Sequence, residues 1–114
     1  MTSGIRTIIY PVNDLAAATK AFTTLIGVAP DQDTPYYVGW NVGGQDVGLD
    51  PNGHAKGMTG PLAFWHVDDI KKSLKQLLAA GASELQPVKD VGGGKLIASV
   101  TDAEGNPIGL IQEP

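Results

Sequence analysis

The side chain with the widest range of chemistry in this sequence is His66. It lies in Leu62-Ala63-Phe64-Trp65-His66-Val67, an apolar and aromatic run that is typical of a strand. Alternation along a strand places His66 on the same face as Leu62 and Phe64. There it would act as a neutral hydrogen-bonding group or as a general base, because histidine side chains titrate near neutrality. The competing interpretation is a wall histidine whose nitrogens are satisfied by backbone or water.

Asp50 and His54 are further donors. Together with His66 they would complete a set of two histidines and one carboxylate, which suits divalent metals. However, Asp50-Pro51-Asn52-Gly53 is also ordinary turn sequence. Solvated turn residues are therefore the alternative to a metal site here.

Three aromatic residues fall on one expected strand, 36–42. Alternation puts Tyr36 and Trp40 on one face and Tyr37 on the other. Aromatic walls with few polar groups suit flat organic ligands, whereas rings that face a helix belong to the core. The candidate ligand-binding residues are Tyr37, Trp40, Asp50, Phe64 and His66, and His66 is also the candidate catalytic residue.

Gly92-Gly93-Gly94-Lys95 has some likeness to a phosphate-binding loop. Such a loop needs an earlier glycine at fixed spacing and a Ser or Thr after the lysine, but Leu96 follows here. We expect a flexible turn in which Lys95 would at most contact an anionic ligand.

Composition limits the partners. The chain has 114 residues and a net charge of −4, and Arg6 is its single arginine, so nucleic acid and anionic membranes are poor partners. The absence of cysteine removes disulfides, thiolate nucleophiles and cysteine-based zinc sites. No basic segment followed by an apolar run opens the sequence, and no run has membrane-spanning length, so we expect a cytoplasmic protein.

The elements that must position these residues come in two similar halves. In the first, a strand at 5–12 leads through Asn13-Asp14 to a helix at 15–26 that Gly27 ends. A loop or irregular strand between Pro30 and Pro35 precedes a hairpin of 36–42 and 45–50. In the second half, a strand at 62–67 and the cap Asp68-Asp69 precede a helix from Ile70 that Gly81 ends. The strands expected after it are 83–88, 95–101, with Leu96, Ala98 and Val100 on one face, and 108–112.

The halves repeat at their helix entrances. Val12-Asn13-Asp14-Leu15 recurs as Val67-Asp68-Asp69-Ile70, 55 positions later. We expect one α+β domain, residues 1–114, made of two βαβββ halves at about 1–51 and 61–114 with a connector at 52–60. Neither half can bury its own sheet face, so the halves should pair.

The chain resembles the vicinal oxygen chelate superfamily, the glyoxalase, bleomycin-resistance and dioxygenase group. The resemblance rests on Tyr10-Pro11-Val12-Asn13-Asp14-Leu15, on its second copy Trp65-His66-Val67-Asp68-Asp69-Ile70, and on the turn from Asp102 to Asn106 before the last strand. It implies a cupped, mixed sheet with helices on its outer face, and commonly a homodimer.

Enzymes of this family hold a divalent metal in the cup through His and Glu side chains. Carried over by the register of the motifs, the four ligand positions are Thr7, Gly48, Leu62 and Gly109. Glycine and leucine have no donor atom and a lone threonine is a poor ligand. The resemblance therefore implies a family member without its metal and without another cofactor.

Three functions remain open. The first is a metal-free module that binds a small, partly aromatic organic molecule in the cup. The second is a lyase, isomerase or dioxygenase of the same superfamily, with a relocated metal or with His66 as a metal-free catalyst. The third is a protein–protein or regulatory module without a working cup.

Overall fold

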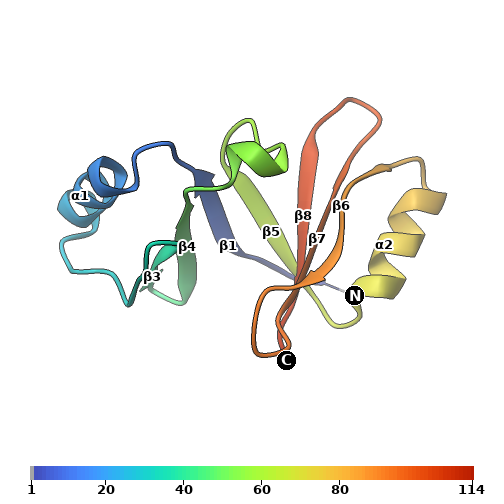
Figure 1. Ribbon diagram of the computed structural model, residues 1–114. Helices are drawn as coiled ribbons and strands as arrows, with labels where there is room; N and C mark the ends of the chain where they lie inside the picture. Colours follow the sequence, from blue (N-terminus) through green and yellow to red (C-terminus); the bar gives the residue numbers. More distant parts are fainter. Residues whose placement is uncertain (1) are drawn as a thin grey trace. The chain divides into compact units, whose positions relative to one another are not determined.

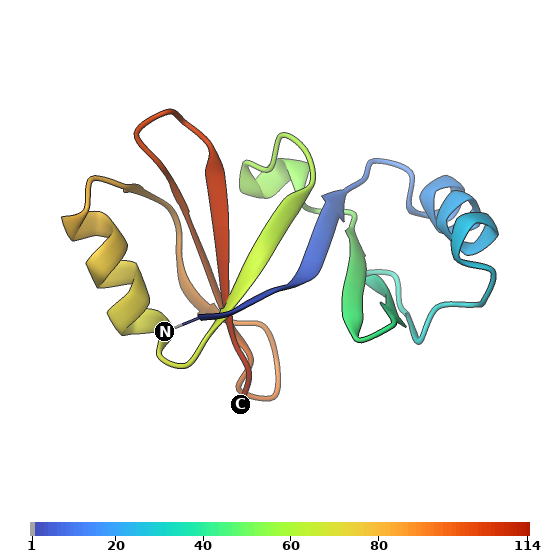
Figure 2. The same cartoon turned by 180° about the vertical axis from the view of Figure 1, so that it is seen from behind.

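The computed structural model describes residues 2–114 and contains two compact units. The first unit is Thr7–Leu62, and the second unit combines residues 2–6 with residues 63–114. In each unit one helix packs against one face of the strands (Figures 1 and 2). The predicted α+β class and the tandem βαβββ modules are confirmed. The predicted cup concerns the placement of one half against the other and stays a prediction.

The first module runs from β1 to β4 (Figure 1). Its strands lie in the order β2-β3-β4-β1, with β1 parallel to β4 and the other pairs antiparallel. Residues 2–6 of β1 belong to the second unit. A short 3-10 helix, His54–Lys56, follows in the connector. The elements are β1 (Thr2–Pro11), α1 (Leu15–Ile26), β2 (Gln32–Asp33), β3 (Val38–Val42) and β4 (Gln45–Asp50).

The second module repeats this pattern. Its strands lie in the order β5-β8-β7-β6, and β5 is parallel to β8 as β1 is to β4. Both modules therefore join a first and a last strand that run in parallel. The elements are β5 (Leu62–Val67), α2 (Ile70–Ala79), β6 (Ser83–Asp90), β7 (Leu96–Thr101) and β8 (Pro107–Gln112).

Each unit has its own core between helix and strands. In the first, Val38, Trp40 and Leu49 are buried, and the α1 side chains pack onto them. In the second, Ile70 and Leu74 of α2 meet strand residues. Those from β7 are Leu96, Ala98 and Val100, as alternation predicts.

Aspartates begin both helices. The Asp14 carboxylate accepts a hydrogen bond from the Ala17 amide at 3.0 Å, and Asp69 accepts one from the Lys72 amide at 3.1 Å. Each bond satisfies an amide that has no partner inside the helix. The repeated motif therefore fixes where each helix leaves its preceding strand.

Three element ends differ from the sequence-based prediction by two residues or more. β1 begins at Thr2, β6 continues to Asp90, and β3 begins only at Val38. Tyr36 is consequently outside the strand, and its side chain is 76% exposed. The cause is a turn in which the Thr34 hydroxyl accepts hydrogen bonds from the amides of Tyr36 and Tyr37.

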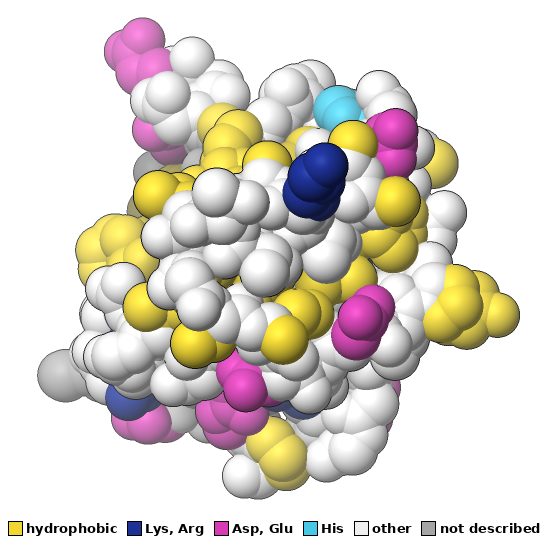
Figure 3. All heavy atoms as spheres, turned by 90° about the vertical axis from the view of Figure 1, so that its left-hand side faces the viewer, with side chains coloured by type: hydrophobic (Ala, Val, Ile, Leu, Met, Phe, Trp, Pro, Cys, Tyr) yellow, Lys and Arg dark blue, Asp and Glu magenta, His cyan; other side chains and the backbone are white. Residues whose placement is uncertain are grey.

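The face that carries α1 offers little chemistry. Figure 3 shows it with hydrophobic and uncharged side chains at its centre and few charged ones. Lys20 is the single charged residue of α1, and Leu25 is 80% exposed.

Within residues 2–114, no helix is long and apolar enough to cross a membrane.

Candidate functional site

His66 occupies the buried face of β5. Leu62, Phe64 and His66 alternate along this strand and are 6%, 5% and 7% exposed, while Trp65 between them is 38% exposed. This is the face that alternation predicts for His66. Its imidazole is thus held in a largely enclosed position near the end of the strand.

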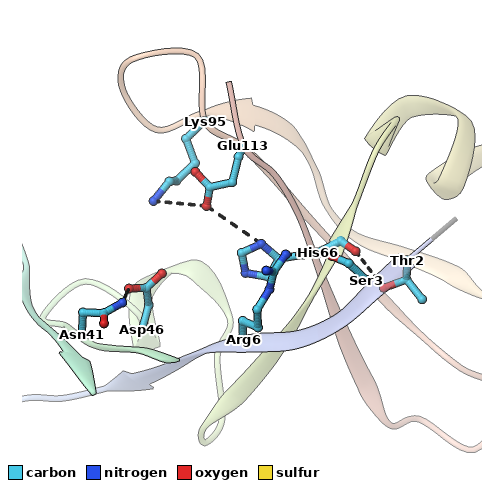
Figure 4. A network of polar contacts seen from close by, with 8 residues as sticks. All are labelled: Thr2, Ser3, Arg6, Asn41, Asp46, His66, Lys95 and Glu113. Atoms are coloured by element: carbon cyan, nitrogen blue, oxygen red, sulfur yellow. Dashed lines mark hydrogen bonds and ion pairs between the residues drawn. The ribbon is translucent and has the colours of Figure 1, made fainter. Parts of the chain in front are cut away.

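The start of β1 holds the backbone of His66. The Thr2 hydroxyl donates to the His66 carbonyl at 2.7 Å and accepts from the Gly4 amide at 3.0 Å (Figure 4). Gly4 has a φ of 107°, a conformation that residues with a side chain rarely adopt. This bend lets residues 2–6 meet the end of β5.

Two charged residues lie beyond the His66 ring. One Glu113 carboxylate oxygen is 3.9 Å from His66 Nδ1 and 3.7 Å from Lys95 Nζ (Figure 4). Strand pairing places both: His66 is opposite Ile111, and Leu96 is opposite Gln112, so residues 113 and 95 extend these strands toward the ring. The contacts are ion-pair distances, too long for hydrogen bonds. They place the Glu113 carboxylate between the imidazole and the Lys95 ammonium group. They contribute little to the stability of the fold, because Lys95 and Glu113 are half-exposed.

His66 and Glu113 border a pocket of about 220 Å³ in the second unit, called here the Arg6 pocket. Its walls include Ser3, Arg6, His66, Gln112 and Glu113. Arg6 donates to the Ser3 hydroxyl at 2.7 Å (Figure 4), and both residues line the same pocket as His66. The Gln112 side-chain oxygen accepts from the Ile70 amide at 2.8 Å and so is committed to the start of α2. The wall of the pocket thus carries two hydrogen-bond donors, Arg6 and Ser3, and the imidazole of His66.

The first implied metal position, Gly48, has no room for a side chain. A Cβ added there would overlap the Tyr37 hydroxyl and would lie 2.7 Å from Ile9 Cδ1. The Tyr37 ring also covers Gly39, which pairs with Gly48 across β3 and β4. The phenol therefore fills the space in which a metal-binding side chain would begin.

The second unit repeats this arrangement at Gly109. A Cβ on Gly109 would lie 2.6 Å from the Phe64 ring and 2.8 Å from the Ala63 carbonyl oxygen. Phe64 pairs with Gly109 as Ile9 pairs with Gly48, and Ile9 and Phe64 are separated by the same 55 positions as the helix entrances. The two glycines are therefore equivalent.

The family metal does not fit these residues. Of the other two implied positions, Thr7 offers a single hydroxyl and Leu62 none, and both are buried. Within either unit of the described chain, no three His, Asp or Glu side chains are gathered for a metal ion. The scarcity of donor atoms at the four positions and the filled space at the two glycines both disfavour a metal ion there.

Tyr37 is itself electrostatically perturbed. Burial, followed by the negative charges of Asp46 and Asp50, raises its pKa to about 12. Both causes disfavour the phenolate. The hydroxyl over Gly48 is therefore neutral at physiological pH.

The other predicted site residues have structural partners. Trp40 is 2% exposed, its ring lies 6.1 Å from the tilted ring of Phe22 of α1, and its indole N–H donates to the Val28 carbonyl. It is therefore a core residue, which was the alternative to a ligand-binding role. Asp50 accepts from the Asn52 amide at 2.8 Å and pairs with Lys56 at 2.9 Å, as in the turn alternative. His66 alone among the predicted residues borders the Arg6 pocket.

Ser3, Arg6 and Glu113 were not predicted as site residues. Glu113 lies two positions beyond Ile111 on β8, so its place near His66 follows only from the pairing of β8 with β5 that the structure shows. One feature of the sequence sets Arg6 apart: it is the single arginine of the chain. Its neighbours could not be derived without the bend at Gly4.

The sequence matches the Glyoxalase/Bleomycin resistance protein/Dioxygenase superfamily over residues 4–110. The chain belongs to this family. The resemblance predicted from the repeated motifs is thereby confirmed. Among curated proteins, none matches the sequence.

Solved structures with the same fold carry different names. A methylmalonyl-CoA epimerase from Mycobacterium tuberculosis is 15% identical with a TM-score of 0.72, over 99% of this chain and 89% of that one. A superfamily member from Vibrio splendidus is 17% identical with a TM-score of 0.70, covering 96% and 99%. A structure described as an NAD-dependent benzaldehyde dehydrogenase from Legionella pneumophila is 13% identical with a TM-score of 0.75, covering 95% and 98%. At these identities the likeness shows the fold alone.

The filling of Gly48 by Tyr37 predicts a coupled pair of mutations. Gly48→Ala should destabilise the protein by about 1–3 kcal/mol, because the new methyl group overlaps the phenol. In a Tyr37→Ala background the same change should cost at least about 1 kcal/mol less. Urea unfolding of the four proteins measures this coupling. Gly60→Ala is the control, since a Cβ there meets nothing within 4 Å. Additive effects would show that the ring does not fill this space.

The raised pKa of Tyr37 predicts a loss of stability at high pH. Because the folded-state pKa of about 12 exceeds the ordinary tyrosine pKa of 10.0, the contribution of the neutral Tyr37 phenol to stability is complete below pH 10 and is lost as pH rises from 10 towards 12. Tyr37→Phe should therefore lose less stability than the wild type between pH 8 and 11 in urea unfolding. Absorbance at 295 nm should show one of the three tyrosines ionising late, and Tyr37→Phe should lack that step. Equal pH dependence would contradict the assignment.

Proposed function

We propose that this chain is a metal-free member of its family that binds a small organic molecule. The observation that carries the proposal is the filling of two equivalent glycines: aromatic rings lie where the first atoms of two metal-binding side chains would have to lie. A chain that retained metal chemistry at these positions would need donors there.

The Arg6 pocket supports binding as the remaining role. It is smaller than typical drug-sized pockets but has several polar groups on its walls. Tyr37, which is only half-buried, supports a ligand with some aromatic surface. We also propose that the chain forms a homodimer and that a cup of the kind implied by the family resemblance binds the ligand.

The proposal predicts two results for purified protein. After dialysis against Zn²⁺, Ni²⁺, Mn²⁺ or Co²⁺, elemental analysis should find far less than one ion per chain. A panel of small aromatic and organic acids, amides and alcohols should contain a compound that raises the melting temperature in proportion to ln(1 + [L]/Kd), with EDTA or without it. Sedimentation of the same samples measures the dimer.

One control separates specific from incidental metal. His54→Ala and His66→Ala each remove one imidazole, so an ion held by chance on either should be lost in that variant. An ion retained at one per chain in both variants would overturn the proposal, as would a panel without any stabilising compound.

A second candidate function, a metal-free catalyst, is favoured by one arrangement. His66 is 7% exposed, its backbone is held by Thr2, and Glu113 faces its Nδ1 at 3.9 Å. A carboxylate that orients an imidazole is a common arrangement for a general base.

Proton exchange distinguishes catalyst from binder. Methylmalonyl-CoA and each acid that raises the melting temperature are incubated with the protein in D₂O and followed by proton NMR. A binder leaves the carbon-bound protons in place. Loss of a C–H signal with the wild type, abolished by His66→Ala and slowed by Glu113→Gln, would favour the catalyst.

A further inference from the structure

We propose that the Arg6 pocket is an oxyanion site, and that the organic molecule bound by this chain carries a carboxylate or phosphoryl group held by Arg6. The inference rests on the proposed function, because it specifies the ligand class of the same pocket.

The first observation is the bonding of Arg6. A guanidinium has five N–H donors in a planar fork. Among the described residues, its one hydrogen-bond acceptor is the Ser3 hydroxyl at 2.7 Å, and no carboxylate lies within ion-pair distance of it. The chain has 12 acidic residues for 8 basic ones, yet among the described residues its single arginine forms no ion pair with a carboxylate, although Asp68 and Glu113 border the same pocket.

The second observation is the state of the acids around the pocket. Glu113 is engaged by Lys95 at 3.7 Å and faces His66 at 3.9 Å. Lys95 thereby offsets the negative charge nearest to the imidazole. Asp68 also borders the pocket and makes no ion pair among the described residues. One negative charge thus remains near the site, which favours a singly charged anion over a multiply charged one.

The third observation is the geometry of the donors. Arg6 and Ser3 come from the same strand on either side of the Gly4 bend, and the Ser3 hydroxyl already accepts from Arg6. That hydroxyl proton remains a donor toward the pocket. An arginine fork with an adjacent hydroxyl matches the two oxygens of a carboxylate or two oxygens of a phosphoryl group.

The size of the pocket limits the ligand. About 220 Å³ accommodates an oxyanion with a compact organic body, and the remainder of a larger ligand would lie outside the pocket. The shared chemistry is a small oxyanion. The test distinguishes its two sources, a carboxylic acid and a phosphoryl group.

The probes are benzoate, its neutral analogue benzyl alcohol, and inorganic phosphate, titrated into the full chain at low ionic strength and followed by ¹⁵N NMR. We expect shifts at Ser3, Arg6 and His66 with benzoate or phosphate and none with benzyl alcohol. Arg6→Gln should weaken anion binding at least about tenfold, and Arg6→Lys should weaken it less, because lysine keeps the charge but loses the fork.

Lys20→Gln is the matched control, since it removes one positive charge from α1 and should leave the affinity unchanged. Binding of benzoate alone identifies a carboxylic acid, and binding of phosphate alone identifies a phosphoryl group. Equal affinity in Arg6→Gln, or no binding of either anion, would overturn the oxyanion site. The proposed function would survive that result if a neutral compound still raised the melting temperature of both the wild type and Arg6→Gln.

Discussion

The contact between Tyr37 and Gly48, with a second ring–glycine contact between Phe64 and Gly109, limits which side chains each module can carry at these positions. Steric repulsion rises steeply as two atoms approach, so a ring and a metal-binding side chain cannot share the same space. A glycine inside a strand also costs stability, and a ring that covers it offsets part of that cost by burying the bare backbone. Ring and glycine therefore form one packing unit in each half, and restoring a donor at either glycine requires moving a ring.

The polar chemistry of the second unit lies instead at strand ends. β5 and β8 are parallel, so their carboxyl ends meet at one edge, where β1 begins through the bond from Thr2 to the His66 carbonyl. Three separate parts of the chain thereby contribute Arg6, His66 and Glu113 to one place. A strand end tolerates polar groups better than a sheet face, because water and loop backbone satisfy their hydrogen bonds.

Features that depend on local pattern could be predicted from the sequence. The repeated helix entrance at Val12 and Val67 indicated the tandem βαβββ topology, and alternation placed His66 and the β7 core residues on the correct faces. Trp40 could not be assigned, because alternation separates two faces without showing which one α1 covers. The predicted start of β3 at Tyr36 was wrong, because the side-chain hydrogen bonds of Thr34 hold Tyr36 and Tyr37 in a turn and the strand begins at Val38.

Long-range features required the structure. The equivalence of Gly48 and Gly109 was implied by the family register, but nothing in the sequence shows that Tyr37 reaches across to Gly48. The pairing of β5 with β8, which brings Glu113 to His66, joins residues more than 40 positions apart. Single-sequence patterns carry no information about such a register.

Net charge and local charge affect the binding of large and small anions differently. A chain with a charge of −4 is a poor partner for a phosphate backbone, because its 12 acidic residues outnumber its 8 basic ones and repel the phosphates. A single small anion needs only one fork. Exposed charges farther than about 10 Å from the pocket are screened by salt, so the excess of acids elsewhere weakens such a site little. The distribution of charge around Arg6, with Glu113 offset by Lys95, therefore matters more for a small ligand than the total does.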